Sequence, residues 1–416
     1  MKELELSHLV LNSILLDGLT TKAAINKIFS THQKDKQFIS VVSILTGCEL
    51  RHHIFFTKCF DEDFKNLTQE EKNLVYLALA NSFFLRRLDK EACKKYIKDV
   101  LKEKYIGKIS TLIDYTGQLS SLIDVDKQSS EYASIRFNTP SWLIKMWKKH
   151  YGNKITFQTL RANITQPSTY VMKNSLHDVK LGDEFKRLSD DIYGYTGKVS
   201  IHKNPLYKSN SGLGEIYPVN PVLVKLINKY LNPMSKEIAL YSGDDDDIVK
   251  HLYVKSNREM GINLAIESLD SRPNLHRLIR MEKIKNINMF KGDSEVALAL
   301  GISYPQDFVL VNPKSSSFGR IRKYPDYIFN FKKESLDELI AKQAEILDNM
   351  SLHVADGGTL IYFVDTMNKK ETNDIVEVFL NKHPYFTLVE SKQCFPFEKE
   401  GVTLFYAVFK LEEQND

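Results

Sequence analysis

The pattern of apolar and polar positions divides the chain into three parts. Over residues 1–130, apolar residues recur at intervals of three and four, as in Leu11, Ile14 and Leu15, and Pro and Gly are scarce. This spacing is typical of helices that bury one face. It predicts an all-α domain over 1–130, built as a bundle of six or seven helices with the apolar stripes in its core.

The pattern is less regular over residues 131–213. Short apolar segments alternate there with turn signals such as Asn138-Thr139-Pro140 and Tyr151-Gly152-Asn153. We expect a small α/β subdomain over 131–213 that joins the helical domain to the rest of the chain.

From residue 214 onward, short apolar stretches alternate with segments of helical spacing such as 336–350. This alternation predicts a doubly wound, mostly parallel sheet over 214–416. The last two stretches have no helix between them, so we expect one of them to run antiparallel. Ligands bind such sheets at the carboxyl ends of the strands, so the residues that follow each strand are the candidate functional residues. The candidate strands are Ile238–Tyr241, Ile262–Ile266, Ile287–Phe290, Phe308–Val311, Thr359–Val364, Phe386–Glu390 and Thr403–Phe409.

The composition narrows the class of protein. The net charge of +4 is mild, so it permits nucleic-acid binding without requiring it. No run of eighteen apolar residues is present, and the first residues lack the basic start and apolar run of a secretory signal. The few cysteines are far apart and form no C-x-x-C pair, which favours reduced thiols in a cytoplasmic protein over disulfides or a zinc site. They are Cys48, Cys59, Cys93 and Cys394.

Several short motifs occur in order between residues 134 and 407. They are Ser134–Leu143, Thr159–Asn163 (TLRAN), Gly319–Asp326 (GRIRKYPD), Leu339–Leu347 with Gln343, Gly357–Tyr362 (GGTLIY) and Leu404–Ala407. In order and spacing, the set resembles the RNA cytosine-C5 methyltransferases of the RsmB (Sun/Fmu) type, and the helical N-terminus resembles the NusB-like RNA-binding domain of that family. The resemblance implies a Rossmann-like methyltransferase domain over 214–416, S-adenosylmethionine as the cofactor and a ribosomal RNA as the partner.

Methyl transfer to cytosine C5 in that family requires a thiolate. The thiolate adds to C6 of the base, and the resulting enamine attacks the methyl group of the cofactor. The family carries one cysteine after its fourth strand and one after its fifth. When this sequence is aligned on the motif GRIRKYPD, the first cysteine position falls on Ser315, and the motif GGTLIY places the second on Asp365. The resemblance therefore implies a catalytic site that has lost both nucleophiles.

The loop that would hold the amino-acid end of the cofactor also departs from the family. The family has two glycines and a lysine there, whereas this chain has Asp246 and Asp247, the last two of a run of four aspartates, followed by Ile248. Adjacent carboxylates repel the methionine carboxylate of the cofactor. Acids are also favoured at the N-terminus of a helix, so the run is also typical of a helix start. A metal site is not expected, because adjacent acids cannot all point at one ion.

A few residues remain as candidates for binding S-adenosylmethionine. Glu267 occupies the place of the family's acid that holds the ribose hydroxyls, and Asp293 that of the acid that contacts the adenine. Gly243 lies in the altered loop, and Asn312 replaces the aspartate of the first cysteine motif. Acids such as Glu267 and Asp293 also occur simply as helix caps and turn residues, so both interpretations stay open.

Basic residues supply candidate contacts to RNA. Arg320, Arg322 and Lys323 lie beside the expected position of a target base, and Arg161 lies in the linking subdomain. Clustered cations attract phosphates, although a basic cluster is as often a solvated surface.

Three functions fit these observations. The first is an RNA-binding member of the family, binding ribosomal RNA, with an eroded and inactive catalytic site. The second is an active ribosomal RNA methyltransferase with a rearranged site. The third is a NusB-like assembly or antitermination factor. The absence of cysteines from the expected positions favours the first.

Overall fold

The computed structural model describes residues 1–412 except 103–104, 190, 208–212, 233–234, 236, 244–245, 257–258, 267–272 and 292–304. The chain forms two compact units. The first contains Met1–Gln166 and Arg320–Lys332, and the second contains Pro167–Gly319 and Lys333–Asp416. The backbone therefore passes between the units three times, and a short excursion from the second unit belongs to the first.

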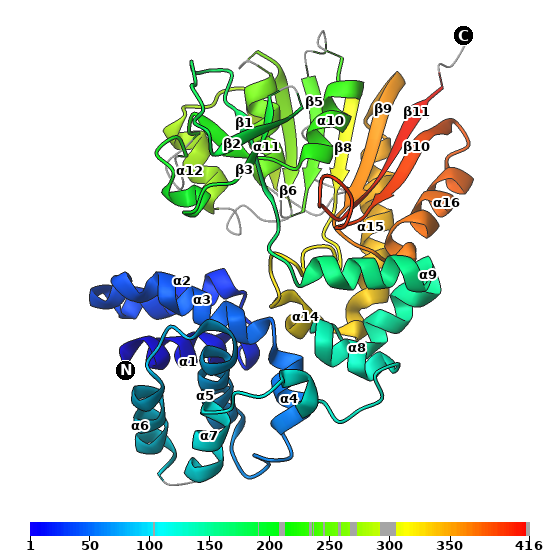
Figure 1. Cartoon of the computed structure of the whole chain (residues 1–416). Helices are drawn as coiled ribbons and strands as arrows, with labels where there is room; N and C mark the ends of the chain where they lie inside the picture. Colours follow the sequence, from blue (N-terminus) through cyan, green and yellow to red (C-terminus); the bar gives the residue numbers. More distant parts are fainter. Residues whose placement is uncertain are drawn as a thin grey trace. The chain divides into compact units, whose positions relative to one another are not determined.

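Helices build the first unit (Figure 1). Seven α-helices, α1 to α7, lie within the described parts of residues 1–130, as the periodicity predicts. The helices are α1 (Lys2–Leu15), α2 (Thr21–Thr31), α3 (Ile39–Leu50), α4 (His53–Phe60), α5 (Gln69–Ala80), α6 (Lys90–Leu101), α7 (Ile106–Ile113), α8 (Ser130–Phe137), α9 (Ser141–Asn163) and α14 (Tyr327–Asn330).

Helix α5 shows how local sequence and packing agree in this unit. All of its residues from Asn73 to Ala80 are buried. A capping box fixes its first turn, because the hydroxyl of Thr68 accepts a hydrogen bond from the backbone N–H of Glu71 and the Glu71 carboxylate accepts one from the N–H of Thr68. The backbone N–H groups of Thr68 and Glu71, which have no carbonyl partner within the helix, are satisfied in this way before the apolar run begins.

Asn138 fixes the start of the α8–α9 pair. It ends α8 in the left-handed conformation (φ 47°), which asparagine tolerates better than most residues. Its side-chain amide donates to the carbonyl of Leu50 (2.8 Å) and accepts from the N–H of Ile54 (3.0 Å). The pair is thereby tied to the junction of α3 and α4. Helix α9 then changes direction at Gly152, whose φ of 77° is non-helical.

The second unit contains two sheets. A small antiparallel sheet has the strand order β2-β3-β1-β4, and a large sheet has the order β10-β11-β9-β8-β5-β6-β7. The elements are β1 (Thr169–Lys173), β2 (Phe185–Ser189), β3 (Ile192–Tyr195), β4 (Ile216–Pro218), α10 (Pro221–Tyr230), β5 (Glu237–Ser242), α11 (Asp246–Lys255), β6 (Gly261–Ile266), α12 (Pro273–Met281), β7 (Ile287–Lys291), β8 (Gln306–Asn312), α15 (Leu336–Ser351), β9 (Val354–Val364), α16 (Asn373–Lys382), β10 (Phe386–Cys394) and β11 (Leu404–Leu411).

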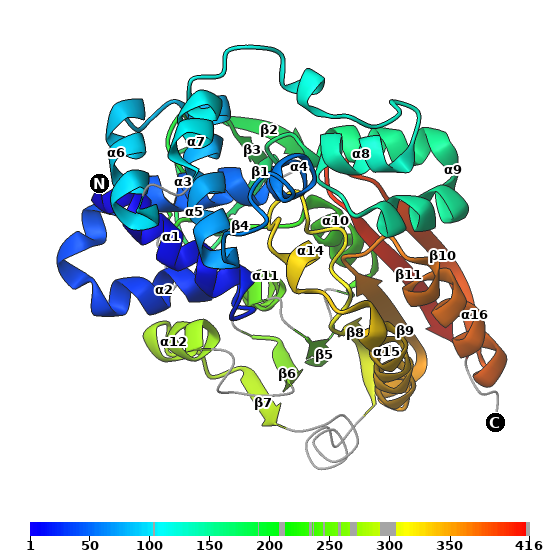
Figure 2. The same ribbon diagram turned by 90° about the horizontal axis from the view of Figure 1, so that it is seen from below.

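Helices cover both faces of the large sheet. Figure 2 shows α10, α11 and α12 on one face and α15 and α16 on the other. Strand β11 runs antiparallel to both β9 and β10, whereas the other described pairs of this sheet are parallel. The predicted doubly wound sheet with one antiparallel strand at its C-terminal end is confirmed.

The compact units divide the chain at other places than the expected boundaries at 130 and 213. Helices α8 and α9 belong to the helical unit, whereas strands β1 to β4 belong to the unit with the large sheet. The expected subdomain over 131–213 is thus shared between the two units. In the described parts of the chain, no helix is both long and apolar enough to cross a membrane.

Candidate functional site at the carboxyl edge of the large sheet

The carboxyl ends of β5, β8 and β9 meet around Asn312. The backbone N–H of Gly243 donates to the carbonyl of Asn312 (2.6 Å), and the side-chain amide of Asn312 donates to the carbonyl of Phe363 (3.0 Å). Asn312 is buried, and its Oδ1 has no hydrogen-bond partner among the described residues. An unpaired buried acceptor is costly, so this oxygen is available to a ligand donor at the edge where such sheets bind ligands.

Gly243 is required here by close approach of the backbone. A Cβ atom at this position would lie 2.6 Å from the backbone nitrogen of Lys314 and 2.9 Å from the carbonyl carbon of Pro313. Backbone atoms cannot move aside as a flexible side chain can. Gly243 therefore allows the loop after β5 to pack directly on the loop after β8.

A buried carboxylate joins the loops after β8 and β9. Glu371 has no exposed surface, and its two oxygens accept hydrogen bonds from five groups. These are the backbone N–H of Ser316 (2.8 Å), the hydroxyls of Ser316 (2.6 Å) and Thr366 (3.3 Å), and the amides of Gln343 (3.0 Å) and Asn368 (3.0 Å). Gln343 also donates to the carbonyl of Lys314 (2.8 Å), so α15 is tied to the same loop.

The two positions at which the family resemblance implies cysteines lie on these two loops. Ser315 is half-buried, and its hydroxyl accepts a hydrogen bond from the backbone N–H of Ser317 (3.2 Å). Asp365 is half-buried, and its carbonyl accepts from the N–H of Gly319 (3.0 Å). Because β8 and β9 are parallel neighbours, both positions lie at one edge of the sheet.

A thiol also reaches this edge, which the local sequence pattern does not predict. Cys394 ends β10 and pairs with Leu404 of β11, and the next residue, Phe405, pairs with Val364 of β9. Its thiol is buried in the core (3% exposed), and burial raises the pKa of Cys394 to about 11. A thiol with that pKa is un-ionised at neutral pH, so Cys394 is a core residue and no nucleophile.

The acidic loop after β5 is partly described. Asp246 begins α11, and the Asp247 carboxylate forms an ion pair with Lys250 one turn along the helix (2.8 Å). This arrangement matches acids in the first turn of a helix, which the macrodipole favours. Glu267 and Asp293 lie outside the described residues. Among the described His, Cys, Asp and Glu residues, no group of three is placed to hold a metal ion.

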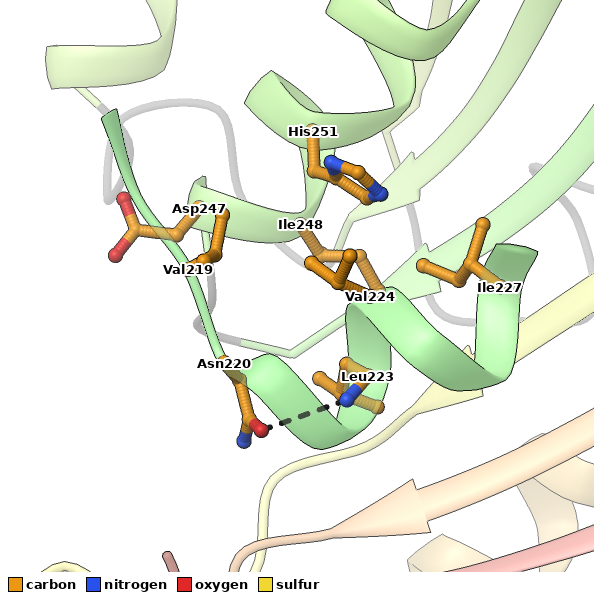
Figure 3. A pocket seen from close by; sticks show the side chains of 8 residues that line it. All are labelled: Val219, Asn220, Leu223, Val224, Ile227, Asp247, Ile248 and His251. Carbon is orange, nitrogen blue, oxygen red and sulfur yellow. Dashed lines mark hydrogen bonds between the residues drawn. The ribbon is translucent and has the colours of Figure 1, made fainter. Parts of the chain in front are cut away.

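A small pocket lies between α10 and α11 and includes Asp247 (Figure 3). His251 lines it and is almost fully buried. Its Nδ1 forms a hydrogen bond with the Tyr217 hydroxyl (3.2 Å), and its Nε2 has no partner in the described part of the protein. Burial lowers the pKa of His251 to about 4, so the imidazole is neutral near pH 7.

The basic side chains that are candidates for RNA contact differ in their exposure and in their hydrogen-bond partners. Arg161 is exposed on α9, and Lys323 is exposed with its ammonium 5.1 Å from the centroid of the Tyr324 ring. Arg320 is half-buried. The Arg322 guanidinium donates three hydrogen bonds, to the carbonyl and hydroxyl of Thr165 (3.1 and 2.9 Å) and to the carbonyl of Gln166 (2.8 Å). Arg322 therefore serves an intramolecular contact that sequence reasoning could not foresee.

Comparison with known proteins finds a family resemblance in the C-terminal part of the chain. Residues 264–407 match the family model of the 16S rRNA methyltransferase RsmB/F. Over this C-terminal part, the chain resembles the RsmB/F methyltransferases. One curated relative is the probable ribosomal RNA small subunit methyltransferase B of Bacillus subtilis, to which the chain is 23% identical over 261 residues. The match covers 59% of this chain and 57% of that protein. The chain thus matches little more than half the length of this RsmB/F relative.

Solved structures resemble the chain in fold. The crystal structure of PH0851 has a TM-score of 0.74 at 16% identity and covers 99% of both chains. That of NSun6 from Pyrococcus horikoshii with SFG has a TM-score of 0.52 at 12% identity and covers 66% of this chain and 99% of that one. Likeness to known RsmB/F enzymes supports S-adenosylmethionine as the cofactor of the family. The resemblance of the N-terminal helices to NusB stays a prediction.

Proposed function

We propose that this chain is an RNA-binding member of the RsmB/F family that binds ribosomal RNA and does not methylate cytosine C5. The observation that carries the proposal is the state of the two loops after β8 and β9. By the resemblance to the family, the positions of its two thiols fall on Ser315 and Asp365. The cysteine near that edge of the sheet, Cys394, is buried in the core.

The chemistry explains why these replacements silence the reaction. Addition to C6 of cytosine requires a soft nucleophile that is ionised near neutral pH, and a thiolate meets both conditions. A serine hydroxyl is un-ionised at neutral pH unless a base activates it. The Ser315 hydroxyl instead accepts a hydrogen bond from a neighbouring backbone N–H. A carboxylate such as that of Asp365 adds poorly to C6.

The site fits S-adenosylmethionine only in part. The unpaired Oδ1 of Asn312 suits a hydrogen-bond donor of a ligand. The loop after β5 does not suit the methionine carboxylate, because four consecutive aspartates replace the family's glycines at the start of α11. We therefore infer weak cofactor binding and derive no catalytic step through the cofactor.

A methyl-transfer assay tests the proposal directly. The purified chain is incubated with a 16S ribosomal RNA transcript and radiolabelled S-adenosylmethionine, with the Bacillus subtilis relative as the positive control. We expect no 5-methylcytidine above the level of heat-denatured protein, and no heat when the cofactor is titrated to millimolar concentration in a calorimeter. Formation of 5-methylcytidine by the purified chain would overturn the proposal.

RNA binding requires a separate measurement. Filter binding of the same transcript over a salt series should give an affinity that falls as salt rises, because counterion release accompanies phosphate contacts. Ser315→Ala and Asp365→Asn should bind RNA like the wild type, since neither side chain is proposed to contact phosphate. No measurable RNA binding at low salt would contradict the RNA-binding part of the proposal alone.

A second candidate function is an active ribosomal RNA methyltransferase with a rearranged site. The unpaired Oδ1 of Asn312 favours it, because a buried acceptor at the ligand edge of the sheet is what a bound substrate or cofactor would satisfy. The methyl-transfer assay separates the two candidates, since only this one predicts a methylated nucleotide.

A further inference from the structure

Helix α9 lies in a long segment of the chain that carries only positive charge. Between Glu131 and Asp178 the sequence has no acidic residue. The chain as a whole has nearly equal numbers of acidic and basic residues, 53 and 57. The basic residues of α9 itself are Lys145, Lys148, Lys149, Lys154 and Arg161.

The helix geometry gathers most of these cations on exposed faces. Lys145 and Lys149 are four residues apart on the first half of α9, and Lys154 and Arg161 are seven apart on the second half, so each pair shares one side of its helix. All four side chains are exposed. The opposite face is buried and apolar; it includes Leu143, Ile144, Trp147 and Leu160.

These cations lack the carboxylate partners that cations have elsewhere in the helical unit. Lys27 pairs with Asp17, and Lys108 pairs with Asp63. Lys145, Lys149, Lys154 and Arg161 have no ion pair or hydrogen bond with any residue that the structure describes. Lys148 differs, because its ammonium lies 5.2 Å from the centroid of the Phe157 ring, across the bend in the helix.

We propose that the exposed pairs Lys145 with Lys149 and Lys154 with Arg161, one on each half of α9 and together called the α9 basic face, are the surface on which this chain binds the phosphate backbone of RNA. The inference rests on the proposed RNA-binding function and names the surface that performs it. Cations held together without acids repel one another, and a polyanion relieves that repulsion while releasing its own counterions.

The composition of the face favours RNA over an acidic protein. Stable protein interfaces depend on large apolar or aromatic anchors that become fully buried. No large apolar side chain within α9 is among the exposed ones. Phosphate contacts need only charge at the right places, and they act without base recognition.

Paired charge-neutralising variants test the α9 basic face. One variant is Lys145→Gln with Lys149→Gln, and a second is Lys154→Gln with Arg161→Gln. The control is Lys95→Gln with Lys98→Gln on α6, which removes the same net charge from two exposed lysines of the same unit. Each protein is titrated with the 16S ribosomal RNA transcript by filter binding at salt concentrations from about 50 to about 300 mM, after circular dichroism has confirmed its helix content.

We expect each α9 variant to bind about tenfold more weakly at about 100 mM salt, with a salt slope lower by about 0.7 to 0.9 for every phosphate that the variant no longer neutralises. The control should keep the wild-type slope. Wild-type affinity and slope in both α9 variants would overturn the α9 basic face while leaving RNA binding intact. A wild-type chain that binds no RNA would instead refute the proposed function.

Competition with poly-glutamate separates the two classes of polyanion. We expect it to displace the transcript only at a large excess of carboxylates over phosphates. If poly-glutamate displaced the transcript at equal numbers of carboxylates and phosphates, and if the α9 variants no longer bound poly-glutamate, the occupant would be an acidic protein. That result would overturn the inference for RNA.

Discussion

Glu371 places a carboxylate with no exposed surface between the loops that follow β8 and β9. Such a group is expensive to desolvate, so it persists only where donors surround it. Here five donors do so, from α15 and from both loops. Glu371 therefore holds the loops that carry Ser315 and Asp365 against each other.

Glu371→Gln should destabilise the second unit by about 3 kcal/mol. The amide nitrogen of the glutamine faces groups that are themselves donors, which leaves buried N–H and O–H groups unsatisfied. Urea denaturation followed by circular dichroism measures the destabilisation. Glu377→Gln on the exposed side of α16 is the matched control and should cost less than about 0.5 kcal/mol. Equal stability of the two variants would show that Glu371 does not join the loops.

His251 should make the stability of the chain depend on pH. Burial lowers the pKa of His251 from 6.5 to about 4. Between these two pH values the imidazole is therefore protonated in the unfolded chain and neutral in the folded chain. The contribution of His251 is therefore fully present above pH 6.5 and disappears as pH falls towards 4. The shift corresponds to roughly 3 kcal/mol.

We expect the free energy of unfolding to drop less between about pH 7.5 and about pH 4.5 in His251→Gln than in the wild type, by about 2 to 3 kcal/mol. Comparing the two proteins cancels the contributions of the other titrating groups to the pH dependence of stability. His53 is one of these groups: although burial opposes its charged form, Glu49 holds the pKa of His53 above its ordinary value. The same drop in both proteins would mean that His251 titrates normally in the folded state.

At the scale of elements, Arg322 joins two points where the backbone crosses between the units. Thr165 and Gln166 immediately precede one crossing, and Arg320 immediately follows another. The guanidinium of Arg322 binds the first pair through three hydrogen bonds. Its fork-like geometry suits several acceptors at once, which a lysine cannot match. We infer that Arg322 holds the end of α9 in place.

Arg322→Ala should loosen the end of α9 without unfolding the chain. Ile164, the residue after α9, is 52% exposed, so thermolysin can cleave beside it once the turn opens. We expect native-state cleavage there to be about tenfold faster than in the wild type, as measured by mass spectrometry of the fragments. Lys323→Ala removes a neighbouring cation and should cleave at the wild-type rate. Equal rates in the two variants would contradict the proposed role of Arg322.

The elements that the sequence predicts correctly are those with strong local patterns. Each apolar stretch from Ile238 to Phe409 that was expected to be a strand coincides with one, except that Thr403 precedes β11. The antiparallel strand follows from the missing helix before β11. Contacts between distant residues leave no local signal. The local sequence around Glu371 is that of an ordinary acid near the start of a helix, and the sequence around Arg322 is that of a solvated basic loop. Both side chains are nevertheless held by partners that are distant in the sequence.

At the scale of the whole molecule, the excursion Arg320–Lys332 makes the second unit depend on the first. Its apolar side chains Ile321 and Ile328 are each 6% exposed. The Asp326 carboxylate accepts from the N–H of Thr21 (3.1 Å). The side-chain amide of Asn330 donates to the carbonyl of Leu19, which lies in the turn between α1 and α2 (3.2 Å). These partners all belong to the first unit.

A chain shortened to residues 167–416 should therefore be soluble only poorly. Phe329 of the excursion packs against the core of the first unit, so it becomes exposed when that unit is removed. Exposed apolar patches promote aggregation. Replacing residues 320–332 in that fragment with a Gly/Ser linker of equal length should restore a monomer with cooperative thermal unfolding, because the large sheet and its two helical layers remain complete. Light scattering and calorimetry of the two fragments measure the difference. If the unmodified fragment is monomeric and the linker changes nothing, the excursion is not a docking element, and the burial of Ile321 and Ile328 contributes little to the folding of the whole chain.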